Sequence, residues 1–259
     1  MIVCADDYGL RKEVDDAILE LCRLGRLSAV SCMVAFRRCD AGGLSSLLAH
    51  QGKVDMGLHL CLTDEGLPLE VAPREGRFPE FKLLLRRALL GKLNRKEILG
   101  LIASQYELFV QKCGRQPNHI DGHLHVHQLP GIRAALVEFL ETLPRENRPY
   151  IRNTRMNGRE LRRCKLPWTK AAFIGTFGRQ MKRLADEKGI RTNNGFAGIY
   201  DFRDWRDYPE LLPRFMECLP ERNGMLVVHP GLKEEWRRQE FECLRNFAGL
   251  EQRVNRWQK

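Results

Sequence analysis

Short apolar runs alternate along the chain with longer amphipathic segments. Residues 2–5, 29–34 and 54–62 are apolar runs of strand length. Residues 12–24 repeat apolar side chains three and four positions apart, the spacing of one helix face, and Gly25 follows as a stop signal. The first quarter of the chain therefore predicts strands separated by a helix.

The alternation continues to residue 228. Three prolines and two glycines indicate a loop at residues 63–79. Asn94 is a candidate helix N-cap with Glu97 three positions on, and the helix it begins is expected to end near Gly114. Further predicted helices span residues 44–50, 81–90, 132–143 and 168–188, and further extended segments span 119–126, 150–152 and 225–228.

This order of elements predicts an α/β fold. Strands that alternate with helices form a parallel sheet with helical crossovers. At 259 residues, with no linker or repeat, the pattern favours one closed or partly closed (β/α) barrel over residues 1–259. A doubly wound open sheet is the alternative, but no G-x-G-x-x-G turn follows the first strand.

Composition and charge narrow the function classes. The chain is 43% hydrophobic, too apolar for a disordered protein, and carries a net charge of +10. Residues 152–191 hold twelve Lys and Arg against three acids, and residues 82–96 hold six Lys and Arg among leucines with no acid. Such stretches suit an anionic membrane, an anionic substrate or solvated helix faces. Without a zinc-finger, RNP-like or helix-turn-helix pattern, no nucleic-acid partner is expected.

Cellular location is predicted from what the N-terminus and the cysteines lack. No run approaches the roughly 20 apolar residues of a membrane helix, and two aspartates follow residues 1–5 where a signal peptide would continue as an apolar region. Nine cysteines without a C-x-x-C pair indicate reduced core thiols. We expect a cytoplasmic protein. Peripheral contact with the inner face of the membrane and formation of a homodimer are both compatible with this expectation.

Polar residues gather where the predicted strands end. In a parallel barrel these ends carry the active site. Six of the seven histidines lie at such positions, and so does an aspartate pair. These residues are Asp6, Asp7, His59, His119, His123, His125, His127 and His229, with Asp121 inside the histidine-rich segment.

The residue types favour a metal site. Adjacent buried carboxylates repel each other unless a cation or proton offsets them, and two histidines with one carboxylate suffice to bind a catalytic divalent ion. In an extended segment His123, His125 and His127 would share one face, at about 6.5 to 7 Å spacing, too far apart for all three to bind one ion. Taken singly, the aspartates could cap a helix and His59 could be a core side chain. Together at strand ends, the residues favour the metal site.

Three motifs carry a family resemblance. Residues 5–10 (ADDYGL), 57–63 (GLHLCLT) and 117–127 (PNHIDGHLHVH) resemble, in order, the ADDFGL, GLHL-x-LT and PTHxDxHxHVH signatures of YdjC/ChbG-type carbohydrate deacetylases, which include members associated with hopanoid biosynthesis. The resemblance runs to about residue 130, with His229-Pro230 as a weaker late match and Tyr8 in place of the commoner Phe. It implies a single deformed, TIM-like (β/α) barrel, related to polysaccharide deacetylases.

The resemblance also implies an activity: hydrolysis of N-acetyl groups on amino sugars with one divalent metal ion, Zn or Mg. Asp7, His59 and His123 would hold the ion, and Asp6 would be the general base. His229 is our candidate to protonate the leaving amine.

Four more residues are expected near the site. Arg152 is expected to orient the Asp6 carboxylate or bind an oxyanion, unless it is an ordinary surface arginine. Asp121 and His125 are expected behind the metal ligands, where they would fix the histidine tautomer. His127 is expected either to bind substrate or to be structural.

Substrate choice and reaction class stay open. Candidate substrates are a chitooligosaccharide, a phosphorylated amino sugar or a lipid-linked one. A metal-dependent phosphoester hydrolase, or another amide hydrolase, would use the same aspartates and histidines. A non-catalytic binding protein is the third reading, and the intact Asp6, Asp7, His59 and His123 set argues against it.

Overall fold

A curled parallel sheet forms the centre of the molecule. The computed structural model describes residues 1–39, 41–156 and 168–258. Within these residues seven strands pair in parallel, in the order β5-β4-β3-β2-β1-β7-β6. Their bounds are β1 Ile2–Tyr8, β2 Ala29–Cys32, β3 Asp55–Leu60, β4 His119–Gly122, β5 Tyr150–Ile151, β6 Gly195–Ala197 and β7 Gly224–Val228.

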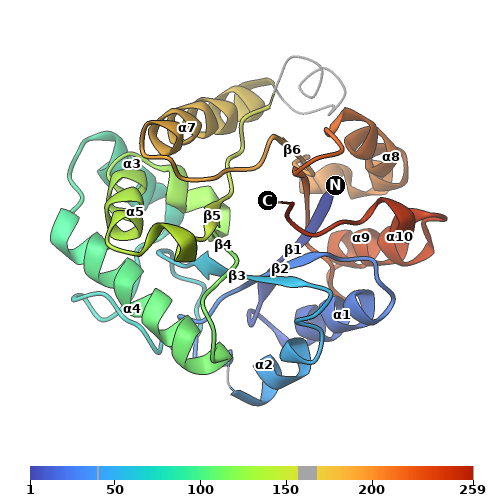
Figure 1. Ribbon diagram of the computed structural model, residues 1–259, viewed down its shortest axis with the longest axis horizontal. Helices are drawn as coiled ribbons and strands as arrows, with labels where there is room; N and C mark the ends of the chain where they lie inside the picture. The colour runs from blue at the N-terminus through green and yellow to red at the C-terminus, as the bar shows by residue number, and fades with distance from the viewer. Residues whose placement is uncertain (40, 157–167, 259) are drawn as a thin grey trace.

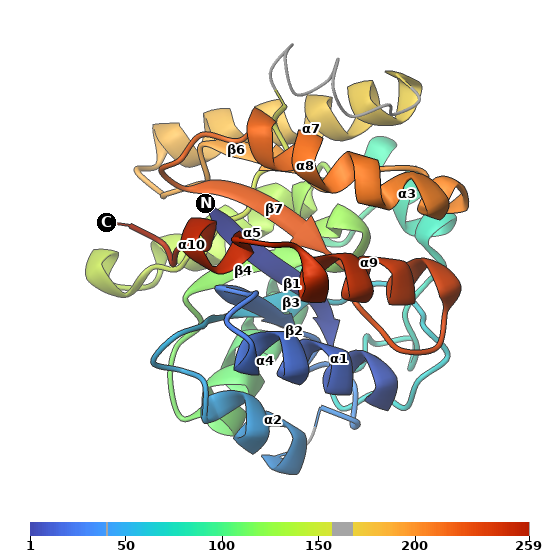
Figure 2. The same cartoon turned by 90° about the vertical axis from the view of Figure 1, so that its right-hand side faces the viewer.

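Helices surround the strands in a ring (Figure 1). Seen from the side, β1 and β7 run through the middle of the molecule with helices above and below them (Figure 2). The α-helices are α1 Lys12–Arg23, α2 Ala41–Leu48, α3 Phe81–Leu89, α4 Arg95–Cys113, α5 Ile132–Glu141, α7 Trp168–Glu187, α8 Tyr208–Cys218, α9 Glu235–Asn246 and α10 Leu250–Arg253. Shorter 3-10 helices are η1 His123–Gln128, η2 Arg145–Asn147 and η3 Phe202–Asp207.

The two edges of the sheet approach each other. Ile151 of β5 forms a parallel bridge with Thr192, just before β6, and its N–H donates to the Arg191 carbonyl over 2.9 Å. The side chains of Asn153 and Asn193 bond each other's backbone across the same gap, at 2.7 to 2.9 Å. The predicted deformed (β/α) barrel is therefore confirmed.

Local signals fixed several helix ends as expected. The Asn94 side chain accepts the Glu97 N–H at 3.2 Å, capping α4, and Gly114 ends that helix with φ 65°. Helix α1 buries its stripe of Val14, Ala17, Ile18, Leu21 and Cys22 against the sheet. Strand β1 is buried along its whole length, as a parallel strand covered on both faces should be.

Two parts of the pattern differ from the prediction. The extended segment expected over residues 119–126 ends at Gly122 and continues as the 3-10 helix η1, in which Leu124 and His125 adopt φ of 52° and 58°. Alternation along a strand therefore does not relate His123, His125 and His127. Elements β6, α8, α9 and α10 were not predicted.

Helix α9 shows why. Its inward face contains Arg237 and Glu240 beside Phe241 and Leu244, and all four are buried. The buried charges interrupt the apolar stripe on which a sequence-based helix prediction depends.

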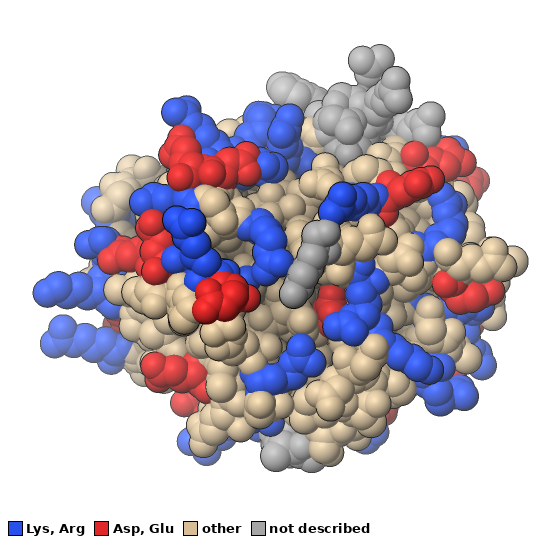
Figure 3. Space-filling model, viewed as in Figure 1, with Lys and Arg blue, Asp and Glu red and all other residues tan. Residues whose placement is uncertain are grey.

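Positive and negative residues are mixed on the face of the molecule that carries the two termini. Lys and Arg are interspersed there with Asp and Glu (Figure 3). In the basic stretch 152–191, Arg152 is fully buried, whereas Lys182 and Arg183 pair with Asp186 and Glu187 along α7. Residues 157–167 of that stretch lie outside the described residues.

Two further expectations concern cysteines and membranes. The eight cysteines within the described ranges are free thiols, six of them buried, and Cys164 lies outside those ranges. No helix in the described part of the chain combines the length and the apolar composition needed to cross a membrane.

Gly57 of β3 tests the tight packing of the barrel interior. A Cβ at this position would lie 2.1 Å from Nε2 of His119, which is buried, bonded to Ser31 Oγ at 2.9 Å and stacked on Tyr150. We expect Gly57→Ala to reduce the free energy of unfolding by about 3 kcal/mol or more, because the imidazole has no room to move. Urea unfolding measures it.

Gly100 supplies the matched control. It is exposed on α4, and a Cβ there would meet nothing within 4 Å. Gly100→Ala should therefore stabilise the protein by roughly 0.5 to 1 kcal/mol through helix propensity. Equal effects of the two substitutions would contradict the packing argument.

Candidate active site

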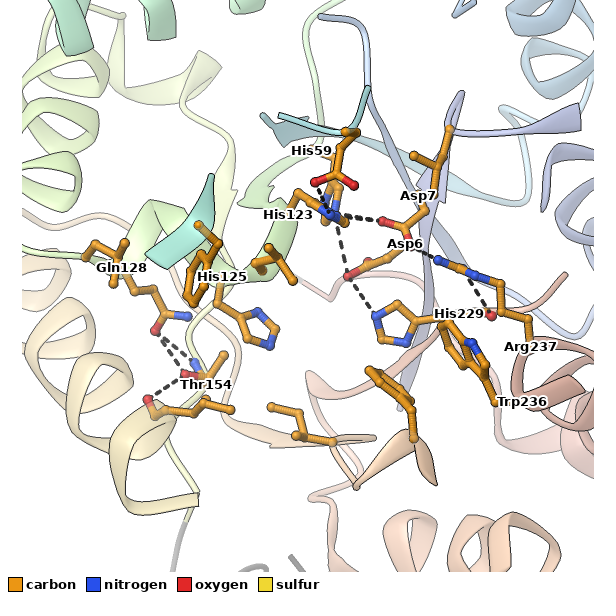
Figure 4. Close-up of a pocket in the computed structure, with 18 of the residues that line it drawn as sticks. Asp6, Asp7, His59, His123, His125, Gln128, Thr154, His229, Trp236 and Arg237 are labelled. Atoms are coloured by element: carbon orange, nitrogen blue, oxygen red, sulfur yellow. Dashed lines mark hydrogen bonds and ion pairs between the residues drawn. The ribbon is translucent and has the colours of Figure 1, made fainter. Parts of the chain in front are cut away.

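The polar strand ends meet at one cavity of about 480 Å³. Asp6, Asp7, His59, His123 and His229 all line it. Figure 4 shows the aspartates and His59 and His123 grouped at one end, with Gln128 and Thr154 on the far side and His125 between. The barrel therefore brings together residues from β1, β3, the start of η1 and the end of β7.

A backbone irregularity turns both aspartates toward this cavity. In a regular strand neighbouring side chains point to opposite faces. Here the pairing of β1 with β2 shifts register between Ala5 and Tyr8, and Asp7 adopts φ 70°. A non-glycine residue rarely adopts this conformation, and such strain gathers at functional sites.

Asp7, His59 and His123 form a compact donor group. Asp7 Oδ1 lies 3.0 Å from His123 Nδ1 and 3.5 Å from His59 Nε2. One ligand atom from each residue lies within 4.8 Å of the other two. One carboxylate oxygen and two imidazole nitrogens at this spacing can hold a divalent metal ion and leave coordination positions for water and substrate.

A carboxylate stands behind each of the two histidines. Asp121 Oδ1 lies 2.6 Å from His59 Nδ1, and Glu65 Oε1 lies 3.1 Å from His123 Nε2. Metal-binding histidines usually pair their second nitrogen in this way, which fixes the tautomer and the ring orientation. The donor set thus fits a metal site.

The charges around these histidines set their protonation. Burial opposes the charged form, yet Asp121 and Asp6 raise the pKa of His59 to about 10. Burial is likewise outweighed at His123, where Asp7 and Glu65 raise the pKa to about 9. Without an ion, both imidazole rings are therefore doubly protonated and positively charged at neutral pH.

Arg152 forms an ion pair with Asp6, the first aspartate of the pair on β1. Its guanidinium contacts both oxygens of Asp6 at 2.6 Å and also Asp121 Oδ2 at 2.6 Å. Arg152 is fully buried beneath the cavity and is not among its lining residues. The structure therefore places it where it orients Asp6 and not where it could meet a substrate oxyanion.

Arg237 of α9 plays the corresponding part for Asp7. Its guanidinium lies 2.7 Å from Asp7 Oδ2. Although burial alone would raise the pKa of Asp7, Arg237 and His123 hold it well below its usual range. Asp7 is consequently a carboxylate at neutral pH, the form that binds a metal.

His229 lies on the opposite side of Asp6 from the donor group. Its Nε2 is 3.9 Å from Asp6 Oδ2. Burial, with Arg237 and Arg152 nearby, lowers the pKa of His229 to about 4. Behind it, Glu240 accepts the His229 backbone N–H at 2.5 Å and the Tyr200 hydroxyl at 2.9 Å.

The other two predicted site histidines, His125 and His127, lie in different places. His125 lines the cavity, with its ring edge-to-face against Phe196, and burial lowers its pKa well below the usual value. His127 does not line the cavity, and its Nε2 lies 2.9 Å from the Arg152 carbonyl oxygen. His125 can thus reach a substrate, whereas His127 supports the strand end.

Two other donor groups involve the buried Arg152. Cys4, His119 and Asp121 form one, and Asp6, His59 and Asp121 form the other. The Arg152 guanidinium lies 3.1 Å from Cys4 Sγ and 2.6 Å from both Asp6 and Asp121. A metal ion there would be repelled by this guanidinium. In the group built on Asp7, Arg237 contacts Oδ2, and Oδ1 faces the two histidines, which favours this group as the metal site.

Comparison with known proteins supplies the family. A model of the YdjC-like protein family matches residues 1–252. The chain belongs to the YdjC-like family. The cavity residues named above all fall within the matched range.

Curated relatives of this YdjC-like chain carry one name. A chitooligosaccharide deacetylase of Escherichia fergusonii is 36% identical over 142 residues, and one of Enterobacter sp. strain 638 is 36% identical over 141 residues. In both comparisons the match covers 54% of this chain and 54% of the relative. The chain thus spans about half the length of the curated relatives it matches.

A solved structure has the same fold. The crystal structure of a protein from Enterococcus faecalis, provisionally described as a cellobiose-phosphate cleavage protein, superposes with a TM-score of 0.68. It covers 100% of this chain and 96% of that chain at 19% identity. At this identity the likeness concerns the fold alone.

Sequence reasoning missed Glu65, Arg237 and Glu240. Glu65 lies in the loop of residues 63–79, where no periodicity marks it. Arg237 and Glu240 lie on the unpredicted helix α9. The one signal available was their three-residue spacing after His229-Pro230, which an ordinary solvated helix face shows equally well.

Glu240 gives the YdjC-like chain a testable dependence of stability on pH. Burial raises the pKa of Glu240 from 4.5 to about 7. Between these values the unfolded chain loses this proton and the folded chain keeps it, so the stability contributed by the group falls as pH rises. Glu240→Gln removes this titration. Its stability relative to wild type should rise by up to about 3 kcal/mol between pH 4.5 and 7.

The measurement is urea unfolding of both proteins across that pH range. Glu235→Gln, an exposed position on the same helix, is the control and should show no pH-dependent difference. Parallel curves for wild type and Glu240→Gln would contradict the raised pKa.

Proposed function

We propose that the chain is a divalent-metal-dependent carbohydrate N-deacetylase, which releases acetate from an N-acetylated amino sugar. The observation that carries the proposal is the convergence of Asp7, His59 and His123 in one cavity with Asp6 and His229 beside them. Family membership and the names of the curated relatives support the same reaction class.

Asp7, His59 and His123 would hold the metal ion. Imidazole nitrogen is a ligand that Zn²⁺ binds well, whereas Mg²⁺ prefers oxygen and binds mainly carboxylates, phosphates and water. Two nitrogens in a set of three therefore favour Zn²⁺ over Mg²⁺. When bound, the ion would acidify water and polarise the amide carbonyl.

Asp6 is proposed as the general base. Hydrolysis adds hydroxyl from water to the carbonyl carbon, breaks the C–N bond and gives the water's proton to the nitrogen. Asp6 takes that proton first. Its two contacts with Arg152, both 2.6 Å, fix the carboxylate orientation that the transfer requires.

His229 is proposed to deliver a proton to the departing amine. With a pKa of about 4 it is neutral at pH 7, so it can donate only after it has received a proton. Once Asp6 has taken the proton of the water, its carboxyl group, 3.9 Å from Nε2, is placed to pass that proton to His229. This arrangement links the base and the acid through a single proton.

The cavity wall bears on the reaction class. Its two arginines are already paired, Arg11 with Glu234 and Arg237 with Asp7. Beside the metal ion, a phosphoester hydrolase gains from Arg or Lys side chains that are free to meet the phosphate charge. The wall therefore favours amide hydrolysis over the phosphoester alternative, and an uncharged over a phosphorylated amino sugar.

The same wall favours a substrate with an apolar portion. It includes Phe81, Phe173, Phe177, Phe202 and Trp236. A lone acetamido sugar would leave much of this aromatic surface uncovered. We propose that the preferred substrate is an amino sugar joined to an apolar aglycone, such as a lipid-linked sugar.

The reaction is tested by acetate release from N-acetylglucosaminides by the Zn²⁺-loaded protein. Asp6→Asn should lower kcat about 10² to 10⁴-fold because the base is lost, and it should keep bound zinc. His59→Ala should lose both zinc and activity. Asp204→Asn, an exposed change on η3, should match wild type. Acetate release that survives chelation or Asp6→Asn would refute the mechanism.

The apolar portion is tested by comparing alkyl with methyl N-acetylglucosaminide. Phe173, 39% exposed at the cavity, should contribute mainly to the alkyl substrate. We expect Phe173→Ala to lower kcat/KM for the alkyl glycoside about tenfold through lost apolar burial, and to change the value for the methyl glycoside little. Equal losses on both substrates would contradict a binding role for the aglycone.

A further inference from the structure

Helix α3 carries an unusual concentration of exposed leucine. Seven large hydrophobic side chains are exposed in the described ranges, and Leu83, Leu89 and Leu90 are three of them, at 42%, 55% and 55%. All three lie within the α3 segment, residues 81–93. On this segment Leu84 and Ala88 are buried, so the exposed leucines are surplus to the packing of the helix.

The α3 segment is also strongly basic. Lys82, Arg86, Arg87 and Lys92 lie on it, and it has no acidic residue. Of these four, only Arg87 has an ion pair among the described residues, with Glu75 at 3.9 Å. Exposed leucines interleaved with unpaired cations complement a surface that is apolar inside and anionic outside.

The segment adjoins the catalytic cavity. Phe81, its first residue, lines the cavity, as do Leu124 and Phe173, two more of the exposed hydrophobic side chains. In Figure 2, α3 lies on the right, the side toward which the arrow of β7 points. A surface bound to α3 would therefore lie beside the carboxyl ends of the strands.

We propose that the α3 segment docks on an anionic lipid bilayer. Leucines 83, 89 and 90 enter the interface between headgroups and acyl chains, and the Lys and Arg side chains contact anionic headgroups. A nucleic acid would match the charge but would leave the leucines in water. For the proposed deacetylase, docking presents the cavity to amino sugars whose apolar portion is held in the membrane.

The test is co-sedimentation of the full chain with phosphatidylcholine vesicles, with and without phosphatidylglycerol. Wild type should bind the phosphatidylglycerol vesicles and dissociate as salt rises. The triple variant Leu83→Ser/Leu89→Ser/Leu90→Ser should bind at least tenfold more weakly. Leu24→Ser, an exposed leucine at the end of α1, is the matched control and should bind as wild type.

A second pair of variants tests the charges. Lys82→Glu/Arg86→Glu should weaken binding at least about 30-fold, because each lost cation costs about 1 kcal/mol and the new glutamates are repelled by the anionic headgroups. Lys53→Glu/Arg145→Glu, two exposed cations outside α3, should leave it unchanged. If the leucine variant misfolds by circular dichroism, this pair still decides the outcome.

Several results would overturn the proposal: no binding by wild type, equal loss in Leu24→Ser or in Lys53→Glu/Arg145→Glu, or full binding by the leucine variant. Single-stranded DNA bound equally by wild type and the leucine variant, and as tightly as vesicles, would indicate a general polyanion site instead. Acetate release from the methyl glycoside should be unchanged in the leucine variant. Vesicle binding without acetate release would refute the proposed function and leave the docking intact.

Discussion

One buried guanidinium holds the site together. Arg152, at the end of β5, contacts Asp6 from β1 and Asp121 from β4, each at 2.6 Å. Two carboxylates in the barrel interior would repel each other and would be costly to desolvate. Arg152 offsets both, and in doing so it connects the edge strand β5 with its neighbour β4 and with β1, four strands along the sheet. Asp121 in turn fixes His59, so the proposed base and a proposed metal-ligand histidine depend on the same guanidinium.

The second constraint is a departure from regular backbone. A straight β1 would point Asp6 and Asp7 to opposite faces. The register shift and the positive φ of Asp7 turn both toward the cavity, and the positive φ values of Leu124 and His125 place His123 and His125 on its wall. Such strain costs about 1 to 3 kcal/mol at each residue. The surrounding ion pairs hold it in place, which ties the geometry of the site to its electrostatics.

These two constraints separate the features that could be predicted from the sequence from those that could not. Strand and helix periodicity predicted the barrel, and the position of polar residues at strand ends pointed to Asp6, Asp7, His59 and His229 as neighbours. The roles of Arg237 and Glu240 were not predicted, because their partners are fixed only when α9 packs against the barrel. The register shift at Asp7 was not predicted, because it arises from the pairing of β1 with β2 and not from the local residues. Contacts that depend on long-range packing were the ones that pattern alone could not supply.

Charge balance explains why this arrangement suits a divalent ion. Around the donor group four carboxylates, Asp6, Asp7, Glu65 and Asp121, face two guanidiniums, so two negative charges remain uncompensated. Without an ion, protons on His59 and His123 compensate it, which is why their pKa values rise to about 10 and about 9. A metal ion would need the same nitrogens unprotonated, so protons and a metal ion would compete for one site. The carboxylates that favour protonation would also favour a divalent ion, whose two charges would replace those of the two displaced protons. The polar framework therefore stays balanced whether the site holds protons or metal.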